Sequence, residues 1–248
     1  MRTDLWGVLG ALLGVVLAPF VFLGGLLRRA RVFHPDGQFF RGRVIATPAP
    51  DPRVQRIAAR LAGFVLARLS ASVHAGPEEV PDWLGGGFRF RADAEPTAVA
   101  GPGDQDVLLA SLESFLSTQK AKRETDQHDY LNNTYYTVAP YLVDGVGKAR
   151  VRLVGSRLGP RTGPRTARLA QAAAAGEAWF RLEVQPRGEP DWLAVARIEL
   201  DGPTEIDMPS WYMTPFRAGR GLTPCGVIHG IRLIVYPVGR LARRLRGV

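Results

Sequence analysis

Two short segments near opposite ends of this chain contain residue types that can carry out chemistry at a metal. Residues 31–37 include His34, whose neutral imidazole near pH 7 can accept a proton and return it. Residues 230–237 include Tyr236, whose phenol oxygen can ligate iron. A metal ion and a nearby cation both favour the anionic form of a phenol, and Arg232 precedes Tyr236 by four residues. In a helix this spacing places both side chains on one face.

Each segment also has a simpler interpretation. His34 comes directly before Pro35-Asp36-Gly37, a sequence that is typical of a tight turn. Residues 231–235 are rich in β-branched types and would suit a strand, which would make Tyr236 an edge residue. The pairing of the two segments and their order in the chain therefore carry the argument for a site.

The composition limits the class of protein. The chain has 248 residues, 46% hydrophobic and 22% charged, which fits one sizeable folded domain. The single cysteine, Cys225, excludes an internal disulfide and a zinc site built on several cysteines, and we expect it to be a buried thiol. The other histidines, His74, His128 and His229, lack metal-ligand spacing. We find no phosphate-binding loop and no nucleophile elbow, and we interpret the glycines at 85–87 as a backbone bend.

The charge of the chain indicates an anionic neighbour. The formal net charge is +9, which suits nucleic acid, an anionic membrane surface or an acidic cofactor. The sequence has no zinc-finger spacing, no RNA-binding aromatic motif and no basic region with heptads, so we expect no nucleic-acid partner. Much of the excess positive charge directly follows an apolar segment or lies at residues 240–246, which favours a membrane surface.

Residues 5–27 form an uncharged apolar stretch. As a helix it would extend about 35 Å at roughly 1.5 Å per residue, which is enough to cross a bilayer. A cleaved signal peptide is the alternative, but its apolar core would be shorter and a small-residue cleavage site would follow it. We therefore predict an uncleaved transmembrane anchor at residues 1–30 and one domain at residues 31–248. Because Arg28, Arg29 and Arg31 follow the segment, the positive-inside rule predicts a single pass with the domain in the cytoplasm.

The rest of the chain predicts a mainly β domain with a few helices. A proline start with an apolar face indicates a helix over 53–64, and an alanine-rich run indicates another over 167–178. Residues 118–129 are polar and suggest an exposed insertion, and residues 155–165 suggest a basic loop. Alternation or β-branched and aromatic residues indicate strands at 44–45, 88–90, 107–109, 133–142, 148–154, 179–185 and 192–200. Strands at this spacing favour a barrel or a sandwich.

Four motifs occur in the order in which haem catalases have them. They resemble the distal-histidine motif, the arginine–serine segment that follows it, the next glycine-containing strand and the proximal tyrosine helix. They read Arg31-Val-Phe-His34-Pro-Asp-Gly37, Leu66-Ala-Arg68-Leu-Ser70, Pro81-Asp-Trp-Leu-Gly85 to Phe90, and Gly230-Ile-Arg232-Leu-Ile-Val-Tyr236-Pro237 with Arg240 and Arg243. The resemblance covers about residues 30–245. It implies an α+β, mainly β fold, with a catalase-like antiparallel β-barrel, flanking helices and one preceding transmembrane helix.

The resemblance also implies a haem b cofactor and a role for each matching residue. Tyr236 matches the iron ligand, and Arg232 matches the group that stabilises its phenolate. His34 matches the distal acid/base, and Ser70 matches the serine that orients the imidazole. The positions that pair with the haem propionates in the family, where a guanidinium suits a carboxylate, are matched by Arg31, Arg68 and Arg243.

One position departs from the family pattern. Catalases have an asparagine after the strand that aligns with residues 106–109, and this chain has Ala110 followed by Ser111. Loss of a group that stabilises developing charge can lower a rate by orders of magnitude. We therefore expect a membrane-anchored haem peroxidase for hydrogen peroxide or lipid hydroperoxides, with an unidentified electron donor, rather than an efficient catalase. The alternatives are a haem sensor or store, a hydroperoxide isomerase, and an anchored barrel for an apolar ligand. Homo-oligomers are common among catalase relatives.

Overall fold

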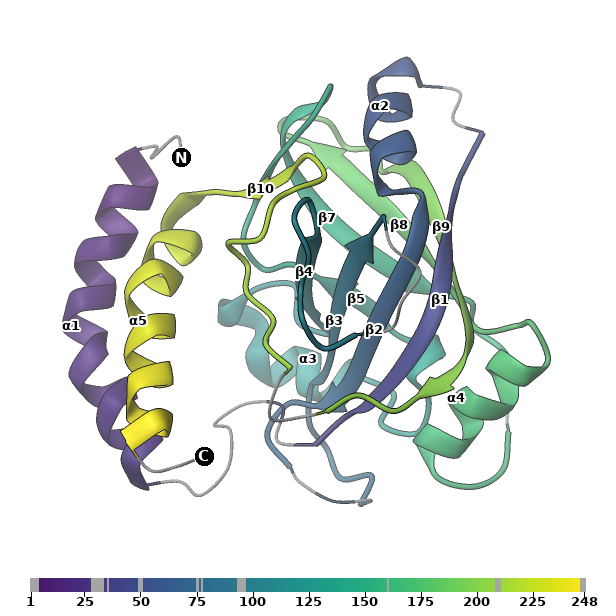
Figure 1. Ribbon diagram of the computed structural model, residues 1–248, viewed down its shortest axis with the longest axis horizontal. Coiled ribbons are helices and arrows are strands. Elements are labelled where there is room, and N and C mark those ends of the chain that lie inside the picture. The colour runs from purple at the N-terminus through teal and green to yellow at the C-terminus, as the bar shows by residue number, and fades with distance from the viewer. Residues whose placement is uncertain are drawn as a thin grey trace.

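The computed structural model describes residues 5–27, 34, 36–48, 51–74, 76, 78–92, 97–159, 161–207 and 211–245, without the side chain of Arg243. Within these residues the elements in chain order are α1 (Leu5–Leu27), β1 (Gln38–Ala46), α2 (Pro52–Leu61), β2 (Gly63–Ala71), β3 (Leu84–Arg91), β4 (Gln105–Ala110), the 3₁₀ turn η1 (Phe115–Ser117), α3 (Thr118–Glu124), the 3₁₀ turn η2 (Tyr130–Asn132), β5 (Thr134–Tyr136), β6 (Tyr141–Val143), β7 (Gly147–Gly155), α4 (Arg165–Ala174), β8 (Trp179–Pro186), β9 (Leu193–Thr204), β10 (Leu222–Pro224) and α5 (Gly226–Leu245). Figure 1 shows a barrel beside a pair of helices.

Strands of the described region close into an eight-stranded antiparallel barrel. Their hydrogen-bonded order is β7-β5-β4-β3-β2-β1-β9-β8, and β8 pairs back onto β7. Closure removes the open edges that a sheet would otherwise expose. In β7 the predicted alternation is present, because Val151 and Leu153 are buried while Arg150, Arg152 and Val154 are not. Beyond β7 the sheet continues through β6 to β10.

The barrel interior is filled by apolar and aromatic side chains. Phe180 packs edge-to-face against Phe88 and Tyr135, with ring centroids 5.6 and 5.9 Å apart. All three rings are fully buried. Aromatic pairs of this geometry stabilise a core beyond the burial of their area. The interior is therefore a packed core and not a ligand cavity.

The strand register aligns one row of outward-facing positions near the start of β3. Gly85 pairs with Ser70 of β2 on one side and with Ala110 of β4 on the other. Directly paired residues of an antiparallel sheet face the same side. Their neighbours Leu69 and Leu109 are buried in the barrel core, so the row faces outward. This row positions the candidate site.

The two helices expected from the sequence are present and shorter than predicted. Helix α2 begins at Pro52 beneath the cap of Asp51, whose side chain accepts a hydrogen bond from the backbone of Arg53 at 2.9 Å. It ends at Leu61 because Gly63, with a φ of 120°, starts β2. Helix α4 ends before 178 for a related reason: Gly176 has a φ of 71° and terminates it.

Helix α1 lies outside the barrel and packs against α5 (Figure 1). Among the described residues, α1 is the one helix whose length and composition would allow it to span a membrane. Helix α5 includes residues 230–237, so this segment is a helix despite its strand-like propensity. Tertiary packing against α1 outweighs that propensity.

Three sequence expectations are corrected. Residues 118–129 are not an exposed insertion, because Thr125, Gln127 and Asp129 are buried, and Asp129 caps η2 through a 2.8 Å bond to Leu131. The strand expected over 133–142 is divided into β5 and β6, because the chain turns between them at positions that include a proline. The glycines at 85–87 lie inside β3 and form no bend.

Candidate functional site

The imidazole of His34 lies against the start of β3. Its Nδ1 is 2.9 Å from Oγ of Ser70. The ring lies on Gly85, where an added methyl group would collide with the imidazole. The serine hydroxyl can donate to Nδ1 or accept from it, so this contact holds the orientation of the ring in either tautomer. The structure thus brings together the histidine and serine that the sequence pairs.

The backbone of His34 is held in a strained conformation. Its φ of 58° lies in the left-handed region, which is unfavourable for a residue with a side chain and persists where surrounding contacts impose it. Its N–H donates to the carbonyl of Ser72 at 2.7 Å, and Nη2 of Arg68 donates to its carbonyl at 3.0 Å. Arg68 is buried and lies over the ring of Phe39 at 5.8 Å. Arg68 therefore positions His34, a role that the resemblance to catalases did not predict.

Ala110 lies in the same outward-facing row as Gly85, against which the His34 imidazole packs. It pairs directly with Gly85, so a longer side chain at position 110 would project beside His34. Ser111 does not replace the missing asparagine. Its hydroxyl accepts from the backbone N–H of Leu84 at 3.0 Å and is 2.8 Å from the hydroxyl of Thr125, which makes it a structural link.

Residues 211–217 run across the outer face of β3 and connect it with α5. Met213 lies on Gly87, on the face that carries the imidazole, and a methyl group at Gly87 would collide with the Met213 sulfur. Phe216 contacts the ring of Tyr236 edge-to-face, with centroids 6.0 Å apart. The segment therefore connects the histidine side of the barrel with the predicted iron ligand in α5.

A buried ion cluster fixes this connecting segment. Asp106 accepts a 2.8 Å hydrogen bond from Nε of Arg89, pairs with Arg217, and accepts from the backbone of Thr214 at 3.0 Å. Arg89 also donates to the carbonyl of Tyr212. The side chains of Arg89 and Asp106 are both 0% exposed. Buried charges that are fully hydrogen-bonded define one arrangement of the groups around them.

Helix α5 carries Tyr236 and Arg232, both half-buried. Nη1 of Arg232 is buried and has no hydrogen-bond partner among the described residues. The hydroxyl of Tyr141 in β6 is in the same situation. Burial raises the pKa of Tyr141 to about 12, and the charge of Arg232 opposes that rise, so the two groups influence each other. Sequence reasoning did not identify Tyr141.

The buried donor of Arg232 suits an anionic group bound beside α5. Buried donors without partners are rare in native proteins, and a guanidinium in that state needs an acceptor. A phenolate at Tyr236, one helical turn from Arg232, is an acceptor of the right charge. Among the described residues, β3, on which His34 lies, is connected to α5, which carries Arg232 and Tyr236, through residues 211–217: Met213 packs on Gly87 and Phe216 packs on Tyr236.

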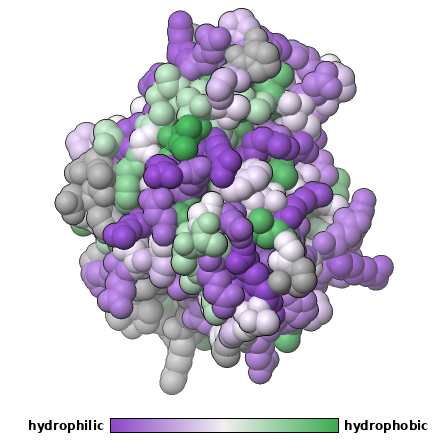
Figure 2. Space-filling view, turned by 90° about the vertical axis from the view of Figure 1, so that its right-hand side faces the viewer, coloured by the Kyte–Doolittle hydropathy of each residue, from purple (hydrophilic) through white to green (hydrophobic). Residues whose placement is uncertain are grey.

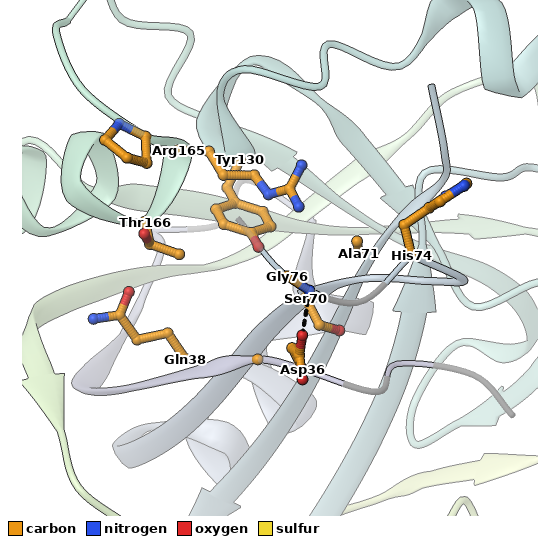
Figure 3. A pocket seen from close by; sticks show the side chains of 11 residues that line it. Asp36, Gln38, Ser70, Ala71, His74, Gly76, Tyr130, Arg165 and Thr166 are labelled. Carbon is orange, nitrogen blue, oxygen red and sulfur yellow. Dashed lines mark hydrogen bonds between the residues drawn. The ribbon is translucent and has the colours of Figure 1, made fainter. Parts of the chain in front are cut away.

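A pocket of about 320 Å³ has Ser70 in its lining. Figure 3 shows Tyr130 and Arg165 on one wall and Asp36 and Gln38 on the other. Burial raises the pKa of Tyr130, and the charge of Arg165 counteracts it. The lining of this pocket includes Ser70 but not Tyr236 or Arg232.

The structure locates most of the predicted site residues. His34, Ser70 and Arg68 lie together at β2 and β3, and Arg232 and Tyr236 lie on α5. Arg31 and the side chain of Arg243 lie outside the described residues. The role of Gly85 could have been predicted from the sequence, because a glycine inside a strand often marks the close approach of another group.

Comparison with known proteins gives a fold. No family model matches the chain, and no curated protein matches it. Solved structures do match: a fungal catalase has a TM-score of 0.59 at 12% identity, a bacterial catalase 0.53 at 9%, and catalase A from Saccharomyces cerevisiae 0.55 at 12%. The matches cover 92%, 92% and 89% of this chain and 62%, 60% and 63% of those proteins. The chain thus spans about three fifths of the catalases, and it has a catalase-like fold.

Proposed function

We propose that this chain is a haem b-dependent peroxidase, attached through residues 5–27 to the cytoplasmic face of a membrane. It reduces hydrogen peroxide or organic hydroperoxides, lipid hydroperoxides included, with electrons from an external donor. The observation that supports this most is the 2.9 Å distance between Nδ1 of His34 and Oγ of Ser70, with the imidazole packed on Gly85, in a barrel of catalase-like fold. A histidine oriented in this way suits general acid–base chemistry.

The cofactor would be held by residues from both ends of the domain. Tyr236 would bind the iron, and Arg232 would stabilise the phenolate through its buried Nη1, which has no hydrogen-bond partner among the described residues. Arg31, Arg68 and Arg243 would pair with the propionates. When bound, haem iron supplies the redox chemistry that cleaves the O–O bond of a peroxide.

His34 moves the proton that this cleavage requires. Its Nε2 accepts a proton from one peroxide oxygen and returns it to the other, which leaves as water or an alcohol. Ser70 keeps the ring in place during both transfers because it holds Nδ1. Ala110 supplies no polar group beside the imidazole, so the rate of hydrogen peroxide disproportionation stays low.

The first experiment is haem reconstitution of the full chain, measured as a Soret band. Tyr236→Phe should lose the band or shift it strongly, whereas Tyr212→Phe, a phenol removed from the connecting segment, should leave it unchanged. If the wild-type chain binds no haem, the proposal is wrong. His34→Ala should retain the Soret band and lose at least about 100-fold in peroxide turnover, the usual minimum for an acid–base residue.

Haem binding without turnover is the second candidate function, and Ala110 favours it. In that case wild-type and His34→Ala proteins would show equal and negligible reduction of both peroxide classes, with equal Soret bands. Conversion of a lipid hydroperoxide without consumption of an electron donor would instead identify an isomerase.

A further inference from the structure

The packing of α1 on α5 restricts how α1 can meet a membrane. Gly10 touches the backbone of Val227 so closely that a methyl group would collide with its carbonyl, and Gly230 is equally close to the backbone of Gly7. Gly14 lies against the backbone of Ile231 and the side chain of Ile234. Small residues at these positions let the two helix backbones approach each other closely.

The two helices run parallel and in register along their length. Gly10 lies opposite Val227 near their N-terminal ends, and Gly25 lies opposite Ala242 near their C-terminal ends. Figure 1 shows α1 as the outermost element, with α5 next to it. Because the contact extends from end to end, α1 cannot cross a bilayer in this arrangement unless α5 crosses beside it.

Helix α5 is unsuited to crossing. It carries Arg232 in its first half and Arg240 and Arg244 in its second half, and charged side chains are unfavourable within the hydrocarbon region of a bilayer. It is also attached to the barrel, because it follows β10 directly and Tyr236 contacts Phe216 of the connecting segment. The helix pair therefore stays with the barrel, outside the hydrocarbon centre.

The outward face of α1 nevertheless needs an apolar neighbour. Most of the exposed large apolar side chains of the described residues belong to α1, among them Leu5, Leu12, Val16, Phe20 and Leu27. Figure 2 shows that the face of the barrel away from the helix pair is mainly hydrophilic, with small apolar areas. A contiguous apolar surface of this kind marks an interaction site.

Positive charge at one end of the helix pair indicates which partner covers the apolar face of α1. Because the helices are parallel, the last turns of α5, with Arg240 and Arg244, lie at the end where Arg28 and Arg29 directly follow α1 in the sequence. Arginines beside an apolar helix face match anionic lipid headgroups beside acyl chains. We propose that α1 lies along the surface of an anionic membrane, with its outward face among the acyl chains, and does not cross it.

This arrangement differs from the single pass expected from the sequence, and it brings the candidate site close to lipid. The axes of packed helices are about 8–10 Å apart, so α5 is one helix layer from the acyl chains. If the proposed function holds, this proximity favours a lipid hydroperoxide over free hydrogen peroxide as substrate. The membrane arrangement itself does not depend on haem.

Cysteine labelling tests the arrangement in the full chain. Thr3→Cys and Ala30→Cys, each in a Cys225→Ala background, flank α1 at its two ends. The purified proteins are added to preformed vesicles of phosphatidylcholine and phosphatidylglycerol and labelled with a membrane-impermeant maleimide from outside. We expect both positions to be labelled to the same extent as after detergent lysis. Protection of one position until lysis means that α1 crosses the bilayer, and this overturns the proposal.

A glycine pair gives a second measurement. Gly10→Leu should separate α1 from α5, whereas Gly24→Leu adds the same apolar side chain at a position with no described atom within 4 Å. Released from α5, α1 is free to insert, so Gly10→Leu should protect Thr3→Cys from outside labelling at least twofold and Gly24→Leu should not. Equal labelling of both variants contradicts the role of the helix pair. A stable dimer in detergent whose formation abolishes vesicle binding identifies a second copy as the occupant and also contradicts it.

Discussion

At the scale of single residues, the position of the His34 imidazole depends on the absence of a side chain at position 85. Gly85→Ala should displace the ring, because the added methyl group collides with it. We expect a loss of peroxide turnover on the order of 100-fold, as for removal of an acid–base group, with the Soret band retained. Steady-state turnover at matched haem content measures this.

Gly87→Ala is the matched control for that change. Its methyl group collides only with the flexible end of Met213, which can move aside, so turnover should change little. Equal losses in the two variants would mean that β3 is simply intolerant of alanine and that Gly85 has no special relation to the imidazole.

Ala110 gives a prediction in the opposite direction. Ala110→Asn places an amide in the outward-facing row beside His34, where it can stabilise developing charge on a bound peroxide. Turnover of hydrogen peroxide should rise by about tenfold or more, since single preorganised donors contribute on the order of 100-fold. The gain should vanish in the Ala110→Asn, His34→Ala double variant; a gain that persists there would show that the amide acts elsewhere.

The contact between two of the candidate site residues was predictable from sequence, because each of them lies in a contiguous motif. His34 and Ser70 were paired in advance, and the structure places them 2.9 Å apart. The backbone role of Arg68 was not predictable, because it depends on where the chain turns before β1. Tyr141 was missed because it comes close to Arg232 only through the packing of β6 against the start of α5.

At the scale of elements, residues 211–217 connect the barrel with α5, and the hydrogen bonds of Asp106 hold this segment in place. Asp106→Asn leaves Arg89 buried without its full counter-charge, and removing one member of a buried ion pair costs about 3–5 kcal/mol. We expect the free energy of unfolding to fall by about that amount in denaturant titrations. Arg43→Gln is the control: it breaks the pair with Glu199, but the Arg43 side chain is 64% exposed, so the free energy of unfolding should change far less than for Asp106→Asn.

The elements themselves were predictable to different extents. The alternation in β7 to β9 was clear, because those strands have one face in the core and one in solvent. The start of α2 was marked by Asp51 and Pro52, but its end was set by the conformation of Gly63, which composition does not reveal. Residues 118–129 were misjudged because polar side chains such as Asp129 are buried to bond the backbone of η2.

At the scale of the whole molecule, the packing of α1 connects the N-terminal segment to the helix that carries Tyr236. Gly14 lies against Ile231 and Ile234 on the two sides of Arg232 in the sequence. Gly14→Leu should push α5 away from α1 and change the contacts of Tyr236, so in detergent the chain should retain haem less well than the wild type, by roughly tenfold in apparent affinity, about 1.4 kcal/mol. Haem transfer to an excess of apomyoglobin measures this loss.

Gly24→Leu distinguishes that coupling from a general effect on the apolar helix. It adds the same side chain one position from the buried Gly25 but meets no described atom, so haem transfer should match the wild type. Because α1 precedes the domain in sequence, it could be regarded as a detachable anchor. Its close glycine contacts with α5 instead make it part of the packing that positions α5. If Gly14→Leu and wild type release haem equally, α1 is an appendage, and the position of Tyr236 is set by the barrel and residues 211–217 alone.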